Sequence, residues 1–189
     1  MTDPAIELLR NLAGRVPDDA MSGFRGYLGA GETTMMGDSL VGHLGRHHVP
    51  VTDFERALLV TVADADPGEI EEIPRVAEIS RDYSFDGGNG APDATETDAR
   101  LITFVDHLPA ARRLSRAWRR PLRAAAAGQA TWLYLLELAP EGDIAAVQSQ
   151  VPIGDATHGV LEVYRSGERL PQYHVEALRA ARAVWSRDT

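Results

Sequence analysis

Two histidines, His43 and His47, have the spacing most typical of a metal site in this sequence. They are four positions apart, about one turn of a helix, so both imidazoles could face one zinc ion. The glutamate of the H-E-x-x-H motif is missing, and Asp38, Asp53 or His107 could complete the site only if the fold brought one of them close. Because such short motifs often match by chance, we expect the two histidines to bind no metal.

Five carboxylates crowd into the nine residues from 64 to 72. They are Asp64, Asp66, Glu69, Glu71 and Glu72. Their spacing lacks the ligand positions of an EF-hand loop and its glutamate at the twelfth place, so a calcium loop is excluded. A solvated turn would explain the segment without any function. The alternative is an acidic patch that attracts a basic protein and sets the rate and specificity of binding, and we predict these five residues as its contacts.

The basic residues gather in a run that also contains Trp118. They are Arg112, Arg113, Arg116, Arg119, Arg120 and Arg123. Arginines interleaved with an aromatic residue are typical of surfaces that bind phosphates and stack bases. Their spacing predicts one solvent-facing side of an amphipathic helix. Since the net charge of the chain is −9, we expect these arginines to pair with its own carboxylates, and nucleic-acid binding ranks as the last alternative.

The remaining motifs of common enzymes are missing. There is no G-x-S-x-G elbow, no S-x-x-K, no P-loop and no cysteine. His158 and His174 could approach Glu162 or Glu137 and form a histidine–carboxylate pair, although packing histidines are commoner. We therefore predict no catalytic residue and no cofactor.

The elements that would position these groups are short helices in the first part of the chain. Apolar residues at helical spacing predict them at residues 4–14, 18–28, 32–48 and 52–63. Asp3 and Pro4 suit the start of the first helix, and Thr52 with Glu55 makes a capping box for the fourth. An acidic turn follows around Pro67, and residues 73–85 fit neither a helical nor a strand period.

The last third of the chain predicts strands as well as helices. Strands are expected at 132–138 and 159–164. Helices are expected at 95–108, in a further segment that ends at Arg120, at 144–151 and at 171–185. Strand, short helix and strand in succession predict a parallel pair, to which residues 73–83 could add a third strand. The apolar run at 132–138 is typical of a strand covered on both faces.

The predicted fold class is α+β: an N-terminal bundle of short helices packed on a small C-terminal α/β unit with two or three strands and covering helices. The expected parts are a helical part at 1–66, an acidic turn, ambiguous strand and glycine-rich linker at 67–91, and an α/β part at 92–189. The two outer parts could share one core. No apolar run reaches the roughly 18 residues of a membrane span, and the acidic start differs from a signal peptide, so we expect a cytoplasmic protein without a membrane partner.

Two stretches carry a resemblance to known proteins: Val-Pro-Val-Thr-Asp-Phe-Glu-Arg-Ala-Leu-Leu at 49–59 and Leu-Glu-Val-Tyr-Arg-Ser-Gly-Glu-Arg-Leu-Pro-Gln-Tyr-His at 161–174. They resemble uncharacterised small acidic proteins of GC-rich actinobacteria, which in turn look like immunity proteins that neutralise polymorphic toxins. The resemblance implies a non-enzymatic inhibitor whose acidic surface covers a basic, toxin-like protein, and it implies no site residues. The alternative is a small enzyme or ligand-binding protein with its site at the carboxyl ends of the C-terminal strands, near 139–143 and 165–168.

Overall fold

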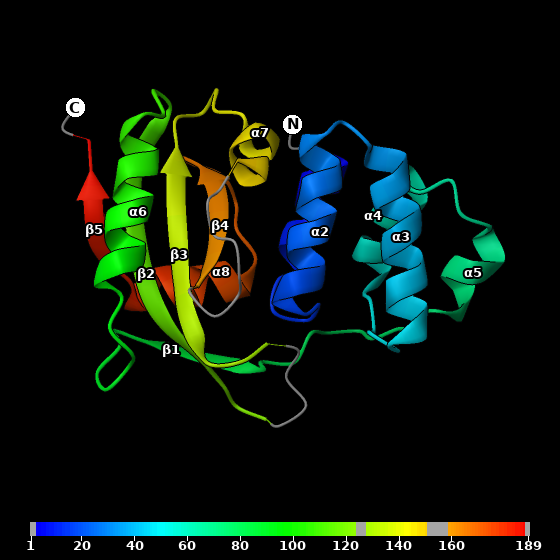
Figure 1. Ribbon diagram of the computed structural model, residues 1–189. Helices are drawn as coiled ribbons and strands as arrows, with labels where there is room; N and C mark the ends of the chain where they lie inside the picture. The colour runs from blue at the N-terminus through cyan, green and yellow to red at the C-terminus, as the bar shows by residue number, and fades with distance from the viewer. Residues whose placement is uncertain (1–2, 124–127, 151–158, 188–189) are drawn as a thin grey trace.

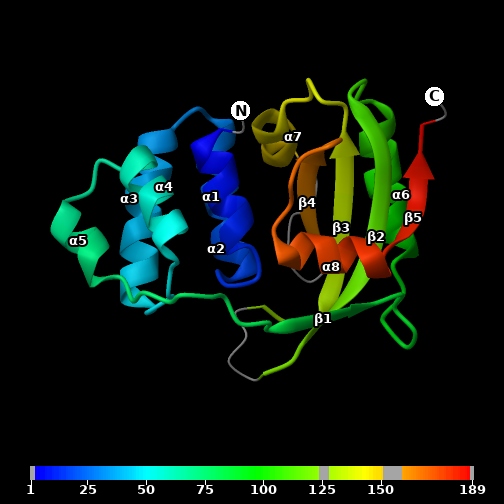
Figure 2. The ribbon, with the colours of Figure 1, turned by 180° about the vertical axis from the view of Figure 1, so that it is seen from behind.

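The structure is a computed structural model that describes residues 3–123, 128–150 and 159–187. Over these residues the chain folds into helices followed by a mixed sheet with helices on both faces, an α+β fold (Figures 1 and 2). The helices are α1 (Pro4–Leu12), α2 (Asp18–Gly29), α3 (Thr33–Arg46), α4 (Asp53–Val62), α5 (Pro67–Glu72), α6 (Thr95–Asp106), α7 (Ile144–Ser149) and α8 (Gln172–Ala180). The strands are β1 (Tyr83–Asp86), β2 (Ala111–Pro121), β3 (Thr131–Leu138), β4 (Val160–Arg165) and β5 (Arg182–Ser186).

The first helices begin where their capping residues predict. The Asp3 carboxylate accepts a hydrogen bond from the backbone N–H of Ala5 at 2.8 Å, and Pro4 occupies the first turn. At the start of α4, Thr52 and Glu55 form both hydrogen bonds of a capping box. These contacts satisfy backbone donors that a helix leaves unpaired at its N-terminus, so local chemistry sets where each helix starts.

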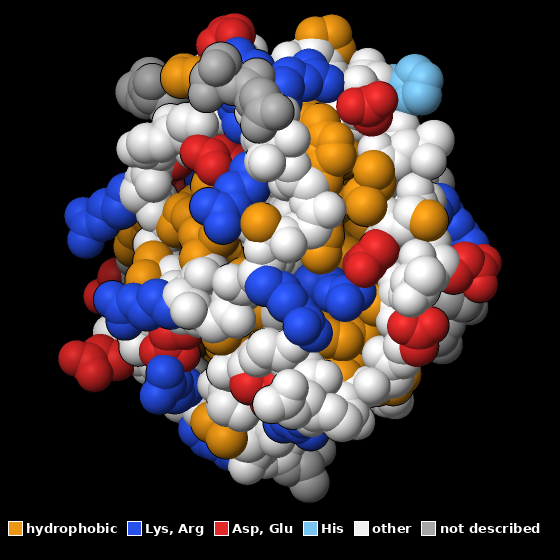
Figure 3. Space-filling model, turned by 90° about the vertical axis from the view of Figure 1, so that its left-hand side faces the viewer, with side chains coloured by type: hydrophobic (Ala, Val, Ile, Leu, Met, Phe, Trp, Pro, Cys, Tyr) orange, Lys and Arg blue, Asp and Glu red, His pale blue; other side chains and the backbone are white. Residues whose placement is uncertain are grey.

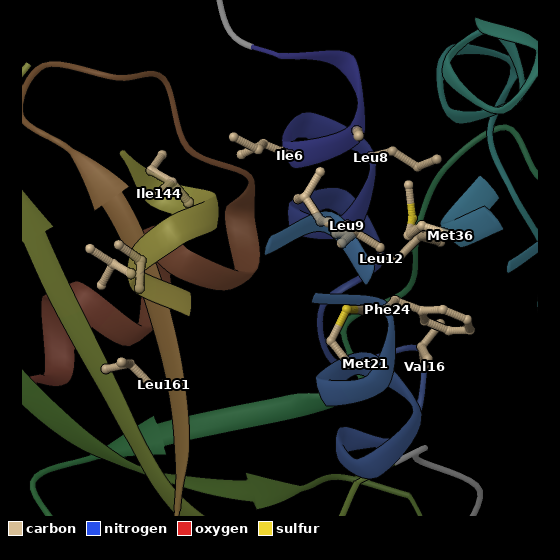
Figure 4. Packing of buried hydrophobic residues seen from close by; sticks show 14 of the residues in the cluster. Ile6, Leu8, Leu9, Leu12, Val16, Met21, Phe24, Met36, Ile144 and Leu161 are labelled. Carbon is tan, nitrogen blue, oxygen red and sulfur yellow. The ribbon is translucent and has the colours of Figure 1, made fainter. Parts of the chain in front are cut away.

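Helix α1 lies between the other helices and the sheet. Its side chains are buried almost all round, and Ile6 points toward Ile144 of α7 (Figure 4). On its other side, Leu8 and Leu12 point toward Met36 of α3 (Figure 4). One cluster of buried apolar side chains runs without interruption from α1 through to β4. The helical part and the sheet are therefore joined by a continuous apolar core.

The sheet is built around β2 and β3. Its order is β1-β2-β3-β4, and β5 pairs with β2 beside the stretch that β1 occupies. Every pairing is antiparallel except that of β3 with β4, which is parallel with Tyr134 opposite Leu161. The parallel strand–helix–strand unit predicted from the sequence is thus confirmed.

Side chains alternate between the two faces of β3, as in any strand. Trp132, Tyr134 and Leu136 belong to the large core cluster, whereas Leu133 and Leu135 belong to a smaller cluster with Tyr164 and Ala177 of α8. Figures 1 and 2 show α6 over one face of the sheet and α8 over the other. Cover on both faces explains why this strand is almost entirely apolar.

Two helix predictions were wrong, and as a result the described sheet has five strands where two or three were expected. The arginine run predicted as an amphipathic helix is the strand β2, which pairs with β3, β1 and β5. The predicted helix 171–185 ends at Ala180, and Arg182–Ser186 continue as β5. In both cases pairing with distant strands outweighs the local helical period. The expected acidic turn also differs, because Pro67–Glu72 forms the short helix α5.

Candidate functional site

The acidic segment 64–72 is a structured and exposed part of the surface. Asp64, Asp66, Glu69, Glu71 and Glu72 are all exposed. The Asp66 carboxylate caps α5 by accepting from the N–H of Gly68 at 2.7 Å. Carboxylates near a helix N-terminus also interact favourably with its dipole. The five residues predicted as partner contacts are therefore presented to solvent by a short capped helix.

A buried arginine fixes α5 to the rest of the helical part. Arg56 of α4 is 8% exposed, and its guanidinium donates to the carbonyls of Ile70 at 2.5 Å and Ile73 at 2.8 Å. The side chains of Ile70 and Ile73 are buried in the core cluster. Because Arg56 ties the C-terminal end of α5 to α4, the position of the acidic segment is set by the fold itself.

The five carboxylates differ in how far they are already neutralised. Glu71 lies 2.6 Å from the guanidinium of Arg75 and 3.6 Å from that of Arg56. Within residues 3–123, 128–150 and 159–187, Asp64, Asp66, Glu69 and Glu72 have no ion pair, and Asp66 is engaged as the cap of α5. The segment therefore carries negative charge that no arginine of the described chain balances.

Helix α4 also exposes an apolar face, which the sequence patterns above do not single out. Phe54, Ala57 and Val60 follow one another at intervals of three, so they lie on the same side of the helix. The exposed fraction is 54% for Phe54 and 62% for Val60. Leu59 and Val62 on the opposite side fill the core. The signal available in the sequence is that α4 has more large apolar residues than one buried stripe can accommodate.

The apolar face of α4 and the acidic segment adjoin each other along the chain. Asp53 begins α4, and Asp64 and Asp66 follow its last turn directly. We call the exposed residues Phe54, Ala57 and Val60, together with the five carboxylates of 64–72, the α4–α5 surface. An apolar centre with a charged surround is the usual composition of a protein-binding site.

The negative charge is concentrated in the same half of the molecule. Residues 1–82 contain seven arginines and 15 acidic residues, a net charge of −8, whereas residues 83–189 contain 12 arginines and 13 acidic residues, a net charge of −1. Helix α5 and strand β5 lie at opposite ends of the molecule (Figure 1). On the face at the β5 end, arginine side chains lie among apolar ones, with acidic side chains interspersed (Figure 3). Nearly all of the net negative charge is therefore carried by residues 1–82.

Four of the six arginines in the run at 112–123 pair with carboxylates of the chain, as predicted, whereas Arg112 donates to the carbonyl of Pro109 at 3.4 Å. Arg116 pairs with Asp98 at 2.5 Å and Arg119 with Asp18 at 2.5 Å. Arg120 and Arg123 pair with Asp86 and Asp82 at 2.8 and 3.0 Å. Arg119 is fully buried, so its charge is used inside the fold.

The two candidate metal ligands, His43 and His47, lie side by side on α3. Their ring centroids are 4.4 Å apart, and His43 also packs edge-on against Phe24 at 5.7 Å. Burial and the neighbouring His47 and Arg46 lower the pKa of His43. In the part of the chain that the structure describes, no group of three or more histidine, aspartate or glutamate side chains could hold a metal ion.

The predicted alternative site at the carboxyl ends of β3 and β4 brings its two segments together. Arg165 donates to the carbonyl of Gly142 at 2.7 Å, and the Ser166 hydroxyl donates to Glu137 at 2.7 Å. Glu168 pairs with Arg10 of α1 at 3.0 Å. These polar groups hold the two loops and α1 to one another.

A buried ionic network joins the helical part to the sheet. Arg25 of α2 donates to both oxygens of Glu162 in β4 at 2.6 and 2.7 Å, and His174 lies 3.2 Å from the same carboxylate. The predicted approach of His174 to Glu162 is confirmed, whereas His158 lies outside the described residues. Burial alone would raise the pKa of Glu162, but Arg25 and His174 outweigh it and lower the pKa to about 2.

A second buried ion pair crosses the same boundary. Arg119 of β2 pairs with Asp18 at the start of α2 and with the Tyr173 hydroxyl at 3.1 Å. Arg10 and Arg25 further donate to the carbonyls of Val163 and Leu161 in β4, at 3.5 and 3.1 Å. No local pattern predicts these contacts, because Arg119 and Asp18, Arg10 and Val163, and Arg25 and Leu161 are each more than 100 positions apart. Because these contacts lie between the helical part and the sheet, we infer that their role is structural.

Comparison with known proteins indicates no function for this chain, so a functional proposal must rest on the geometry described above. No family model, no curated protein and no solved structure matches the chain. Among the described residues, no helix has both the length and the apolar character required to cross a membrane.

Proposed function

We propose that this chain is a non-enzymatic inhibitor of the immunity-protein type, which binds and neutralises a basic, toxin-like protein through the α4–α5 surface. The observation that carries the proposal is the exposed apolar face of α4, with Phe54 and Val60 more than half exposed beside five exposed carboxylates. Exposed large apolar side chains next to charge are typical of interaction sites. We expect the protein to act in the cytoplasm.

Each component of this surface would have its own role in binding. Phe54 is the natural anchor, because aromatic side chains that become fully desolvated at the centre of an interface carry most of the affinity. Asp64, Glu69 and Glu72 would attract a basic surface from a distance and raise the rate of association. Because Arg56 holds α5 in place, little ordering would be needed on binding.

The test is capture of the partner by tagged protein in extracts of the source cell. We expect the wild-type chain to retain a basic protein that the Phe54→Asp variant does not retain. The matched control is Leu122→Asp, which places the same charge on a side chain that is also 54% exposed but lies directly after β2. This control should capture the partner as the wild type does.

Inhibition is tested by producing the captured partner with and without this chain. Growth arrest by the partner alone, relieved by the wild type and by Leu122→Asp but not by Phe54→Asp, would support a toxin-neutralising role. A partner that is acidic, or one that Phe54→Asp still captures and neutralises, would contradict the proposal.

A further inference from the structure

A pocket of about 280 Å³ lies away from the exposed face of α4, where the end of α1 meets β1 and α8. Its walls include the rings of Tyr83, Phe85 and Tyr173. Tyr173 packs edge-on against the other two rings, with centroid distances of 5.9 and 5.2 Å. Aromatic walls favour cations and the aliphatic stems of long side chains.

Three carboxylates line the pocket, and each has an arginine partner. Glu55 is paired with Arg15, and both side chains are at least nine-tenths buried, so this pair is closed. Asp82 pairs with Arg123 at 3.0 Å. The Glu176 side chain is 11% exposed and pairs with Arg81, so it is the carboxylate that a cationic ligand could engage by displacing an exposed arginine.

Glu176 already pairs with the guanidinium group of Arg81, which lies in an exposed connecting segment. Arg81 donates from Nε to one oxygen of Glu176 at 2.7 Å, while Nη2 lies 2.6 Å from the other oxygen. This two-pronged arrangement is the geometry that carboxylates select in arginine over lysine. The Arg81 side chain is 61% exposed and belongs to the connection between α5 and β1, which has no helix or strand of its own.

Arg81 is exposed whereas Glu176 is nearly buried, so another arginine could replace Arg81 as the partner of Glu176. Glu176 is held by α8, and Gln172 one turn earlier donates to it at 2.9 Å, so the carboxylate stays in place. An ion pair with an exposed arginine contributes little to stability, because water and salt screen it. A guanidinium from outside can therefore take the place of Arg81 at small cost to the fold.

We propose that this pocket binds the guanidinium group of an arginine from outside the chain, and that Arg81 occupies Glu176 in its absence. The incoming group pairs with Glu176, and its aliphatic stem lies along the rings of Phe85 and Tyr173. The inference does not depend on the proposed inhibitor function, since it concerns different residues. Free arginine and an arginine of a protein offer the same chemistry, and the experiment separates these sources.

The test measures binding of Nα-acetyl-arginine amide to the full chain by calorimetry. Nα-acetyl-citrulline amide, which has the same shape without the charge, should bind at least about tenfold more weakly. Arg81→Ala should bind the arginine probe about threefold to tenfold more tightly, because the internal competitor is gone. Glu176→Gln should bind it at least about tenfold more weakly.

The matched control is Arg75→Ala. Arg75 is an exposed arginine of the same connection that pairs with Glu71, and it does not line the pocket. Its removal should leave probe binding unchanged within about twofold. Thermal melting of each variant checks that the fold is retained.

Three results would overturn the inference: no binding of the arginine probe to the wild type or to Arg81→Ala, equal binding of the citrulline probe, or equal affinity of Arg81→Ala and the wild type. Where the probe binds, free arginine and the tripeptide Gly-Arg-Gly identify the source. Tighter binding of free arginine assigns the pocket to the amino acid, and equal binding assigns it to a protein side chain. None of these three results bears on the α4–α5 surface, because Phe54 variants report on that surface alone.

Discussion

Glu162 links the helical part of the molecule to the sheet through a buried ionic network. It is 3% exposed and lies in β4, with Arg25 of α2 and His174 of α8 on its carboxylate. A charge removed from water is stable only while its partners remain, so loss of one partner is more harmful than loss of both. This asymmetry gives a test that does not rely on the function.

We predict that Glu162→Gln lowers the free energy of unfolding by about 3–5 kcal/mol, because it leaves the buried Arg25 without a counter-charge. The double variant Arg25→Met, Glu162→Met should lose less than the sum of the two single variants. Chemical denaturation of the wild type, Arg25→Met, Glu162→Met and the double variant measures this coupling, and Glu162→Gln is measured beside them. Additive losses would show that the two side chains are not coupled.

The depressed pKa of Glu162 also predicts how stability depends on pH. The group ionises at about 2 in the folded chain and has an ordinary value of 4.5, so the folded state favours the charged form. Its contribution is fully present above the ordinary value and is lost as pH falls toward the folded value. Unfolding followed from about pH 5 to about pH 2.5 should show a steeper loss for the wild type than for Glu162→Gln. Parallel curves would contradict the assignment.

At the scale of elements, close packing against α3 fixes the position of α4, the helix that carries the exposed apolar face. A Cβ atom at Gly37 would lie 2.7 Å from the carbonyl oxygen of Val62 and 2.8 Å from Cα of Ala63. Gly37 therefore permits the close approach of α3 to the end of α4. Nothing lies within 4 Å of a Cβ at Gly42 or Gly45.

Two substitutions in α3 should therefore have opposite effects. Gly37→Ala should destabilise the protein by about 1–3 kcal/mol, because backbone atoms of α4 cannot move aside easily. Gly42→Ala should stabilise it by about 0.5–1 kcal/mol, because alanine restricts the unfolded chain and favours the helix. Thermal or chemical unfolding decides between them, and an equal effect at both positions would contradict the α3–α4 packing.

The sequence predicts elements well where local chemistry sets them. The helix starts at Asp3 and Thr52 follow from their caps, and β3 and β4 follow from their apolar runs. It fails at β2, where arginines at helical spacing pair with carboxylates from other segments. It fails again at β5, which exists because β2 offers it a partner. Both errors concern interactions between residues far apart in sequence.

Only part of the candidate site could be predicted from the sequence. The charge of residues 64–72 is evident from the sequence, but the exposure of Phe54 depends on which side of α4 the core takes. The pocket beside Glu176 requires α1, β1 and α8 to meet, which no local pattern predicts. Surfaces that form from several elements need the structure.

At the scale of the whole molecule, the uneven charge predicts how a partner associates. Replacing Asp64, Glu69 and Glu72 by Asn, Gln and Gln should slow association with the captured partner about threefold to tenfold at low salt and weaken its salt dependence. The dissociation rate should change little. The control replaces the exposed Glu96, Asp106 and Glu141 by amides, which changes the net charge equally in the other half of the chain. Surface plasmon resonance gives both rates, and equal slowing by both triple variants would contradict local steering.

The central claim is that the exposed face of α4 is the site of contact, and the dissociation constant of the captured partner tests it most directly. We predict that Phe54→Ala weakens binding by at least about 2 kcal/mol, roughly 30-fold, as expected for an aromatic anchor. Leu122→Ala, an equally exposed apolar side chain directly after β2, should leave affinity within about twofold. An unchanged affinity for Phe54→Ala, or an equal loss for Leu122→Ala, would contradict the account.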